Sequence, residues 1–518
     1  MDFQKKMSEK AVITLAIFIA GLCSLIYELL ISTTTSYFLG DSIRQFSLTI
    51  GIYMAAMGLG SYLSKYFSDE HLAVRFIVVE ALLGIIGGSS VPLLYYGFER
   101  LSPGGYIGLM VVLTAVVGLL TGFEIPLLAR IMKKYYPLRV NLANVMSLDY
   151  FGALAATLLF PFLLLPFFGV FRTSVFFGLV NIALGVFILW YFSEHIRKQT
   201  ANWLYGFSLF SMLAFAGLLY FARPILMAWD GQSFSHRVVF SKQTPYQHLI
   251  LTRNKEEIRL YINRIIQFSS ADEYRYHEAL ALLPLQAAPY RKNILVLGGG
   301  EGLLARELLK EPSVESITII DLDPEVFRLA RENPYIRALN EGSLGHPKVR
   351  TIAMDAAAFL RESNEYYDLI IADLPDPSNE AVARLYSTHF FRLAQNRLTP
   401  NGVFATQASS PFHTRNAFWC IYETLRQSGF EQVLPYHTYV PSFGDWGFIM
   451  ASRQPLEVRP FRTSLPVRYL DEAVVDAMFD FPRDSDNPGG LKPNRLDQPA
   501  LLEYYLADWS KWSREKIR

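Results

Sequence analysis

The chain has 518 residues, a length that accommodates about two to four domains of ordinary size. Hydrophobic residues make up 51% of it and charged residues only 18%, which argues against a disordered chain and against an ordinary soluble enzyme. A net charge of +1 without a basic stripe argues against a large nucleic-acid-binding surface, and two cysteines are too few for a disulfide framework or a cysteine-rich zinc site.

The two halves of the chain differ in composition. Residues 1–225 contain 26 of the 48 basic and 47 acidic residues, about 12% of that stretch, whereas the remainder is about 24% charged. Only the second half has the composition of a soluble domain.

Seven apolar stretches occupy the first half, and each is long enough to cross a hydrocarbon core of about 30 Å. Lysines precede the first stretch, but no small-residue cleavage site follows it, so we expect a retained membrane helix rather than a signal peptide. The pattern predicts a multi-pass α-helical domain over 1–225, in the cell (inner) membrane. The stretches are 11–32, 46–63, 76–97, 106–128, 147–169, 174–192 and 204–222.

Four acidic residues lie in or beside these stretches: Glu28, Glu80, Glu124 and Asp149. A carboxylate in hydrocarbon costs several kcal/mol unless it is paired, protonated or hydrated. Two interpretations follow: neutral carboxyls hydrogen-bonded to neighbouring helices, or a cation path or polyamine-sensing cavity.

The basic residues between the stretches make a conflicting prediction about topology. The loops on the N-terminal side carry eleven Lys and Arg and the other side three, which favours a cytoplasmic N-terminus. Seven spans then place the second half outside, although cytosolic substrates call for a cytoplasmic catalytic domain. A re-entrant segment near Pro161 to Pro166 would resolve this conflict, and so would an unrecognised eighth span.

The second half changes to shorter periodic runs. Residues 230–285 alternate as strands of a small antiparallel β domain. Residues 286–455 alternate buried strands with helices, which predicts a Rossmann-like, methyltransferase-type doubly wound α/β domain. A tail over 456–518 holds two helix-like pieces, near 470–479 and 498–513.

Polar or glycine residues follow four successive strands of the α/β domain. Gly298 to Gly302 opens a helix after the first strand, and Asp321 ends the second, where a ribose diol binds in such folds. Asp355-Ala356 follows the third strand and suits an adenine amino group, and Asp373 ends the fourth. Any single Asp here could instead cap a helix, but together they predict an adenosyl-sulfonium site.

An acidic loop, Asp373-Leu374-Pro375-Asp376-Pro377, lies beside this predicted nucleoside site. With Glu301 it provides three carboxylates, which repel an anionic substrate and attract a cation. S-adenosylmethionine carries a carboxylate, whereas its decarboxylated form ends in an ammonium group. The charge therefore favours the decarboxylated compound.

Residues 240–450 resemble the spermidine synthase (polyamine aminopropyltransferase) family, and the apolar first half resembles its membrane-fused bacterial branch. The resemblance rests on Tyr246-Gln247, Asp272-Glu273-Tyr274, Tyr276-His277-Glu278, Gly298 to Gly302, Asp355-Ala356, Asp373 to Pro377, Leu385-Tyr386-Ser387, Gln407 and Pro441 to Phe448.

The resemblance implies transfer of an aminopropyl group from decarboxylated S-adenosylmethionine to putrescine, giving spermidine and 5′-methylthioadenosine. It makes Asp373 the catalytic base and places Tyr276, His277 and Asp376 along the diamine channel. It implies that the nucleoside and the aminopropyl arm are bound by Gln247, Gly298, Gly300, Glu301, Asp321, Asp355 and Ala356. It implies no metal, no cofactor beyond the co-substrate, and a possible homodimer.

Departures from the family pattern concern the amine end most. The family usually has Asp at Glu301, Glu at Asp321, Asp-Gly at Asn263-Arg264 and Tyr at Phe443, so the identity of the amine stays open. The alternatives are a methyltransferase on the same fold and a polyamine-sensing or transport protein.

Overall fold

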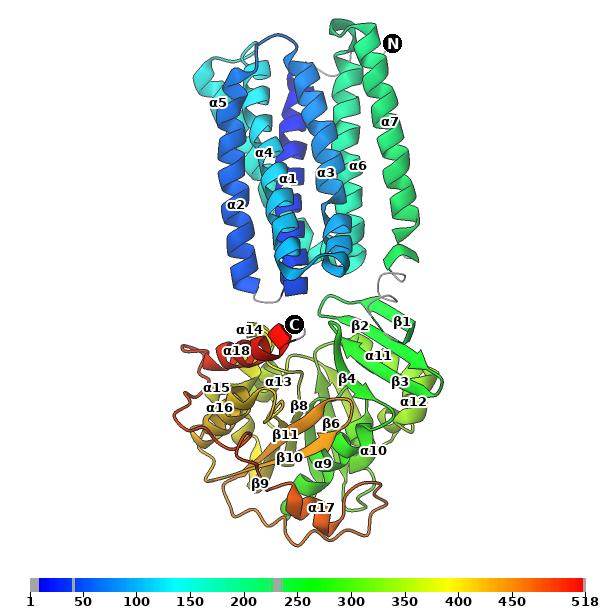
Figure 1. Cartoon of the computed structure of the whole chain (residues 1–518), viewed down its shortest axis with the longest axis vertical. Coiled ribbons are helices and arrows are strands. Elements are labelled where there is room, and N and C mark those ends of the chain that lie inside the picture. Colours follow the sequence, from blue (N-terminus) through cyan, green and yellow to red (C-terminus); the bar gives the residue numbers. More distant parts are fainter. Residues whose placement is uncertain (1–8, 40–41, 223, 227–233, 235, 516–518) are drawn as a thin grey trace. The chain divides into compact units, whose positions relative to one another are not determined.

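The computed structural model describes residues 9–39, 42–222, 224–226, 234 and 236–515 (Figure 1). The chain divides into two compact units, Met1–Ser235 and His236–Arg518, which are described separately below.

The first unit is a bundle of long apolar helices (Figure 1). Among the described residues, six helical segments are long and apolar enough to cross a membrane. The helices are α1 (Glu9–Leu39), α2 (Ser42–Leu63), α3 (Leu72–Arg100), α4 (Pro103–Met132), α5 (Leu138–Leu159), α6 (Leu165–Tyr191) and α7 (Lys198–Tyr220).

Within the described part of this unit, seven helices occupy the seven apolar stretches, but two of them, α5 and α6, follow one another without a loop. A π-helical turn, Phe160–Leu164, joins them, and Arg139–Tyr191 forms one apolar segment of 53 residues. Gly169, with φ of 70°, breaks the helical path, and α5 packs on α1 whereas α6 packs on α3. The segment therefore bends between α5 and α6, next to the Pro161 to Pro166 stretch for which the sequence predicts a re-entrant segment as one alternative.

Small residues bring the helices of the bundle close together. A Cβ added to Gly60 of α2 would lie 2.1 Å from the Leu119 carbonyl oxygen of α4, and one on Gly122 would lie 2.1 Å from that of Met57. Such approaches are typical of helices that associate without a hydrophobic driving force.

Polar side chains join three helices inside the bundle. Asn181 of α6 donates to Glu80 of α3 at 2.6 Å and accepts from the Tyr27 hydroxyl of α1 at 3.0 Å. Glu80 and Glu124 are 0% and 2% exposed. For Glu80, the structure agrees with the interpretation of a carboxyl that hydrogen-bonds a neighbouring helix.

The second unit begins with a four-stranded antiparallel sheet in the order β1-β2-β3-β4. This is the small β domain that alternation over 230–285 predicts. Its strands are β1 (Arg237–Gln243), β2 (His248–Asn254), β3 (Glu257–Ile262) and β4 (Ile265–Ser269).

A seven-stranded sheet follows, in the order β10-β11-β9-β8-β5-β6-β7. Neighbouring strands from β9 to β7 are parallel, as the alternation of strands and helices predicts, whereas β10 and β11 are antiparallel and are missing from the prediction. The strands are β5 (Asn293–Gly298), β6 (Ser316–Asp321), β7 (Val349–Ala353), β8 (Tyr367–Asp373), β9 (Leu398–Gln407), β10 (Gln432–Val440) and β11 (Gly444–Ser452).

Helices cover this sheet and carry part of the site (Figure 1). The two tail helices, α17 and α18, lie where the sequence predicts helix-like pieces. The helices are α9 (Glu273–Ala287), α10 (Leu303–Leu308), α11 (Pro324–Glu332), α12 (Pro334–Leu339), α13 (Ala356–Glu362), α14 (Glu380–Ala383), α15 (Thr388–Gln395), α16 (Arg415–Arg426), α17 (Glu472–Ala477) and α18 (Ala500–Glu515).

Candidate active site

The predicted site residues meet at one edge of the large sheet. Strands β8, β5, β6 and β7 are neighbours and run parallel, so their carboxyl ends lie together. In the sheet register Gly298 is the partner of Asp373. The structure thus brings Gly298, Asp321, Asp355 and Asp373 to the edge where open α/β sheets bind ligands.

The glycine loop after β5 makes this close approach possible. Gly298 has φ of 88°, and a Cβ there would lie 2.0 Å from the Asp373 carbonyl oxygen. The Gly300 N–H donates to Asp321 Oδ2 at 3.2 Å, and a Cβ on Gly300 would lie 2.6 Å from the same oxygen. Glycine at these two positions therefore lets three strand ends touch.

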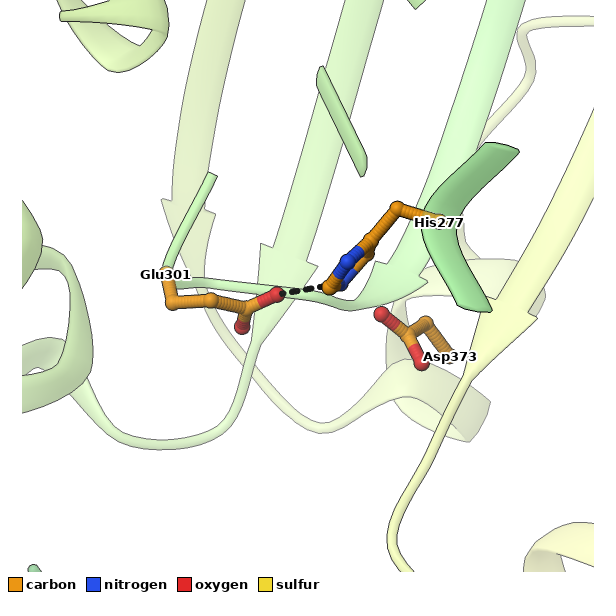
Figure 2. Close-up of side chains that lie close together, drawn as sticks. All are labelled: His277, Glu301 and Asp373. Atoms are coloured by element: carbon orange, nitrogen blue, oxygen red, sulfur yellow. Dashed lines mark ion pairs between the residues drawn. The ribbon is translucent and has the colours of Figure 1, made fainter. Parts of the chain in front are cut away.

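His277, Glu301 and Asp373 form the centre of the site (Figure 2). Each offers one ligand atom within 4.8 Å of the others, and His277 Nε2 lies 3.7 Å from Glu301 Oε1. Glu301 comes from the glycine loop, His277 from α9 and Asp373 from the end of β8. Residues far apart in sequence thus build one compact, charged cluster.

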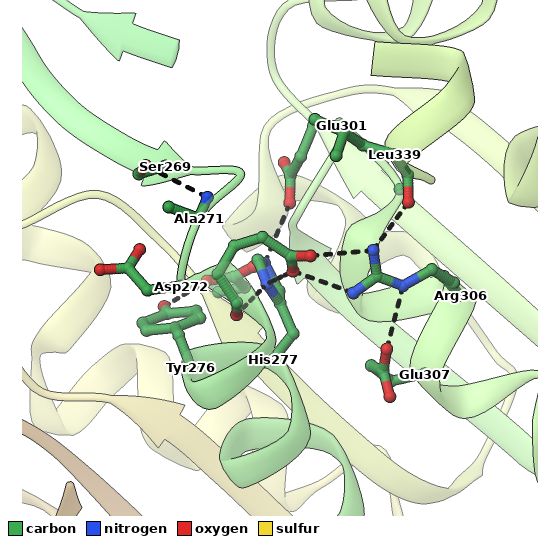
Figure 3. A network of polar contacts seen from close by, with 12 residues as sticks. Ser269, Ala271, Asp272, Tyr276, His277, Glu301, Arg306, Glu307 and Leu339 are labelled. Carbon is green, nitrogen blue, oxygen red and sulfur yellow. Dashed lines mark hydrogen bonds and ion pairs between the residues drawn. The ribbon is translucent and has the colours of Figure 1, made fainter. Parts of the chain in front are cut away.

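Two residues behind the cluster fix His277 (Figure 3). Its Nδ1 donates to Glu273 Oε2 at 2.7 Å and to the Glu273 carbonyl at 2.8 Å. Arg306 of α10 donates to both carboxylate oxygens of Glu273, at 3.0 and 2.9 Å. Burial raises the pKa of Glu273, but His277 and Arg306 outweigh burial and lower the pKa to about 2.

This arrangement keeps His277 positively charged. Burial alone lowers its pKa, but the hydrogen bond to Glu273 and the ion pair with Glu301 outweigh that effect and raise the pKa to about 10. An imidazolium has no lone pair for a metal, so the cluster at neutral pH suits an organic ammonium better than a metal ion.

Asp373 is the carboxylate at which a proton could be accepted. The Tyr276 hydroxyl donates to its Oδ1 at 2.6 Å. Burial and the nearby charge of Glu301 raise the pKa of Asp373 to about 6, although His277 and Tyr276 oppose the shift. A carboxylate with such a pKa is ionised at neutral pH and is still a better base than an exposed aspartate.

Asp321 and Asp355, both predicted to bind the nucleoside, each have both carboxylate oxygens in contacts within the protein: Asp321 accepts from the Gly300 and Asp323 N–H groups, at 3.2 and 3.0 Å. Burial, with the charge of Glu301, raises the pKa of Asp321 to about 7. Asp355 caps α13 by accepting from the Ala358 N–H at 2.9 Å, and its other oxygen pairs with Arg384. Both oxygens of Asp355 are thus engaged, as the helix-capping alternative predicts, and the adjoining Ala356 is 8% exposed.

Gln247 lies in the turn between β1 and β2, and this turn is tied to the same sheet edge. The Thr244 hydroxyl donates to Asp323 Oδ2 at 2.7 Å and also contacts the Gln247 carbonyl oxygen at 3.0 Å. Asp323 follows directly after β6 and caps α11. The small β domain thereby holds Gln247 near the end of β6.

Asp376 contacts a different element from the central cluster. Its Oδ2 accepts from the Tyr505 hydroxyl of α18 at 3.0 Å. Burial raises the pKa of Asp376 to about 6. The structure therefore separates the three predicted carboxylates into a close pair, Glu301 and Asp373, and a third that a C-terminal helix contacts.

Three residues of this site are not among those predicted from the sequence. Glu273 belongs to a motif of the family resemblance but has no predicted role, and Arg306 and Tyr505 belong to no such motif. Arg306 lies 33 residues from Glu273, and Tyr505 lies 129 residues from Asp376, so no local spacing reveals either contact. Nothing in the local sequence marks Arg306 or Tyr505 as buried, because both occur in ordinary helical stretches.

The fold and site define a class: a Rossmann-like α/β domain with a charged cluster at the sheet edge where such folds bind ligands. Comparisons with known proteins specify it further. A family model described as the Spermine/spermidine synthase domain matches residues 273–460. The chain is 40% identical over 509 residues to polyamine aminopropyltransferase 2 of Ralstonia nicotianae, covering 96% of this chain and 98% of that protein.

Two further relatives agree. Polyamine aminopropyltransferase of Leptospira interrogans is 38% identical over 502 residues, with 96% of this chain and 98% of that protein covered. Polyamine aminopropyltransferase of Mycobacterium tuberculosis is 36% identical over 513 residues, with 96% and 97% covered. A crystal structure of spermidine synthase in complex with the transition state analogue AdoDATO is 25% identical, with a TM-score of 0.45, and covers 47% of this chain and 85% of that chain.

The chain belongs to the polyamine aminopropyltransferase family. The similarity runs through the apolar first half as well as the catalytic half, since 96% of the chain is covered. The predicted family and the predicted enzyme class, an aminopropyltransferase, are confirmed.

Proposed function

We propose that the chain transfers the aminopropyl group of decarboxylated S-adenosylmethionine to putrescine, giving spermidine and 5′-methylthioadenosine. The observation that carries the proposal is the central cluster. Glu301 and Asp373 lie beside a single imidazolium, so the cluster has a net negative charge when both carboxyls are ionised. Such a cluster attracts ammonium groups and repels the carboxylate of ordinary S-adenosylmethionine.

In this proposal the sheet edge holds the sulfonium compound. Glu301 binds the ammonium of the aminopropyl arm, and Asp321 accepts from the ribose hydroxyls. The glycine loop lets the nucleoside approach the backbone. Residues proposed to contact the nucleoside are Gln247, Gly298, Gly300, Asp321, Asp355 and Ala356.

Asp373 acts on the attacking amine. The neutral amine nitrogen uses its lone pair to form a bond to the aminopropyl carbon next to sulfur. The carbon–sulfur bond breaks and its electrons remain on sulfur, which becomes the neutral thioether of methylthioadenosine. Asp373 takes the proton that the new secondary ammonium loses. The Tyr276 hydroxyl orients the Asp373 carboxylate through the 2.6 Å hydrogen bond.

The remaining residues position the two reactants. His277, held by Glu273 and Arg306, keeps Glu301 and Asp373 in place between the two substrates. Tyr276, His277 and Asp376 line the proposed diamine channel. Holding amine and carbon in line supplies much of the rate acceleration by proximity.

The test is an assay of the purified full chain with decarboxylated S-adenosylmethionine and a panel of diamines. We expect methylthioadenosine with putrescine and a loss of kcat of about 10²–10⁴-fold in Asp373→Asn, because an amide accepts no proton. Asp497→Asn is the matched control, since Asp497 is exposed and pairs with Arg495. Methyl transfer from ordinary S-adenosylmethionine, or no product with any diamine, would refute the proposal.

We further propose that the apolar helices span the cell membrane and that the catalytic unit faces the cytoplasm and forms a homodimer. The proposal includes no metal and no cofactor besides the co-substrate. Full activity after dialysis against a chelator, and a dimer mass in light scattering with the detergent contribution subtracted, are the expected results.

A further inference from the structure

The C-terminal helix α18 reaches the acidic loop of the site although it lies outside residues 273–460, which the family domain covers. Tyr505 of α18 is 5% exposed, and its hydroxyl donates to Asp376 Oδ2 at 3.0 Å. An element beyond the catalytic domain thus supplies a polar contact to a residue of the proposed amine channel.

Helix α18 is firmly docked on the catalytic unit, beside α16 (Figure 1). The carboxylate of Asp508, 1% exposed, accepts from the backbone and side-chain nitrogens of Asn416, at 2.8 Å each. Trp512 donates from Nε1 to the His413 carbonyl at 2.9 Å. Asp508 and Trp512 follow Tyr505 on the same helix, so these contacts hold the helix that carries the Tyr505 hydroxyl.

The loop that carries Asp376 is held from another side. Tyr386 donates to the Pro375 carbonyl at 3.0 Å, and Gln407 Nε2 donates to the Leu374 carbonyl at 2.6 Å. With the loop backbone held in this way, the Tyr505 hydroxyl donates the hydrogen bond that holds Asp376 Oδ2, and the Ser409 and Gln407 side chains are close enough to oppose the rise in the pKa of this carboxyl.

The second oxygen of Asp376 points to a ligand. Asp376 Oδ1 is buried and has no hydrogen-bond partner among the described residues. A buried carboxylate oxygen without a partner is costly. An ammonium group of the substrate would remove that cost.

We propose that Tyr505 is a positioning residue for the amine substrate: it holds Asp376 by Oδ2 so that Oδ1 receives the distal ammonium of the diamine, the one that does not react. This inference rests on the proposed function and adds a residue from the tail to it. The tail thereby helps to select a dication over a monoamine.

The test compares Tyr505→Phe with the wild-type full chain. We expect the KM for putrescine to rise about tenfold or more, since a hydrogen bond to a charged group contributes about 1.5–3 kcal/mol. We expect kcat, and the KM for decarboxylated S-adenosylmethionine, to stay within about twofold, because the reacting atoms are untouched. Tyr504→Phe is the matched control, since the Tyr504 hydroxyl contacts only the Lys492 N–H, at 3.4 Å, in the described contacts.

Two further measurements separate positioning from a general structural effect. The affinity for butan-1-amine, measured as a competitive inhibitor against putrescine, should be the same in Tyr505→Phe and wild type, because this monoamine has no distal ammonium. In an Asp376→Asn background, Tyr505→Phe should have little additional effect on the KM for putrescine, because the two residues act as one unit.

The inference is overturned if Tyr505→Phe behaves like Tyr504→Phe, if butan-1-amine binding weakens as much as putrescine binding, or if the effects of Tyr505→Phe and Asp376→Asn simply multiply. The proposed function fails separately, when the wild-type chain forms no methylthioadenosine from any diamine.

Discussion

His277 determines the charge of the catalytic cluster, although it is not the proposed base. Its imidazolium lies between two carboxylates and is kept protonated by Glu273, which Arg306 in turn holds. A neutral histidine would leave Glu301 and Asp373 to repel one another without compensation. The buried chain from Arg306 to Asp373 thus alternates in sign, which is what allows two carboxylates to share one small site.

The pH dependence of the reaction tests this charge arrangement. Asp373 accepts a proton only when ionised, and burial together with Glu301 raises its pKa to about 6. We therefore expect kcat, measured with both substrates saturating, to fall as the pH drops below about 6, while His277, with a pKa near 10, stays charged.

Glu301→Gln removes the neighbouring negative charge. We expect it to lower the pKa of Asp373 and to move the acidic limb of the pH profile to lower pH, even though overall activity falls. The position of the limb, not its height, is the measurement. A limb that moves to higher pH in Glu301→Gln would contradict the arrangement.

Single residues show what could be predicted from sequence at the site. Gly298, Asp321, Asp355 and Asp373 end successive strands, so strand periodicity alone brings them to one edge, and the structure does so. The engagement of Asp355 with Arg384 and of Asp376 with Tyr505 depends on tertiary contacts across 29 and 129 residues. No local pattern encodes such distances.

Among the elements, the turn between β5 and α10 is the one most constrained by the site. Gly298 has φ of 88°, and a Cβ would lie 2.0 Å from the Asp373 carbonyl oxygen, which is backbone and cannot rotate away. We expect Gly298→Ala to reduce kcat/KM at least about tenfold and to lower the melting temperature, since left-handed backbone alone costs about 1–2 kcal/mol for a residue with a side chain.

Gly345→Ala is the matched control for that turn, because a Cβ there meets nothing within 4 Å. Its kinetics and melting temperature should equal those of wild type. Equal behaviour of the two variants would show that the loop does not need glycine at 298.

The crossing of α2 and α4 offers a second test, because substitutions at Gly58 and Gly60, two residues apart, should change the stability in different directions. A Cβ on Gly60 would lie 2.1 Å from the Leu119 carbonyl, whereas one on Gly58 meets nothing within 4 Å. We expect Gly60→Ala to destabilise the protein by about 1–3 kcal/mol, as overpacking does. Gly58→Ala should be neutral or slightly stabilising, since alanine is the better helix former.

Thermal unfolding of both variants in the same detergent is the measurement. Loss of stability in Gly58→Ala, with none in Gly60→Ala, would contradict the packing of these two helices.

Elements with a clear period were predictable, and those defined by partners were not. Strands β5 to β9 are short buried runs between helices, and apolar length identified the helices of the bundle. Strands β10 and β11 pair antiparallel with each other and β11 with β9. Their sequences carry Pro435 and Gly444, which weaken a strand signal, so the pairing rather than the local sequence makes them strands.

On the scale of the whole molecule, the fold-back of α5 and α6 bears on the side of the membrane that each part faces. A straight helix of 53 residues would be about 80 Å long, far more than a bilayer core of about 30 Å. Because the segment turns at Gly169, it would cross the proposed membrane twice, which would give seven passes in all. With a cytoplasmic catalytic unit, seven passes conflict with the distribution of basic residues, whereas a re-entrant segment here would leave six and remove the conflict.

Cysteine labelling of the full chain in intact cells decides this question. The native Cys23 and Cys420 are both buried, so single cysteines can be introduced without replacing them. With seven passes, Ser102→Cys, after three helices, lies on the same side as the catalytic unit, marked by Asp497→Cys, and Lys133→Cys lies on the opposite side. All three positions are exposed.

Because both proposed reactants are cytosolic, we expect an impermeant maleimide to label Lys133→Cys alone before lysis and all three after it. Labelling of Asp497→Cys together with Lys133→Cys, with Ser102→Cys protected, would contradict seven passes. Labelling of Asp497→Cys and Ser102→Cys, with Lys133→Cys protected, would mean that the basic loops are inside, as the positive-inside rule demands, and that the catalytic unit works outside the cytoplasm.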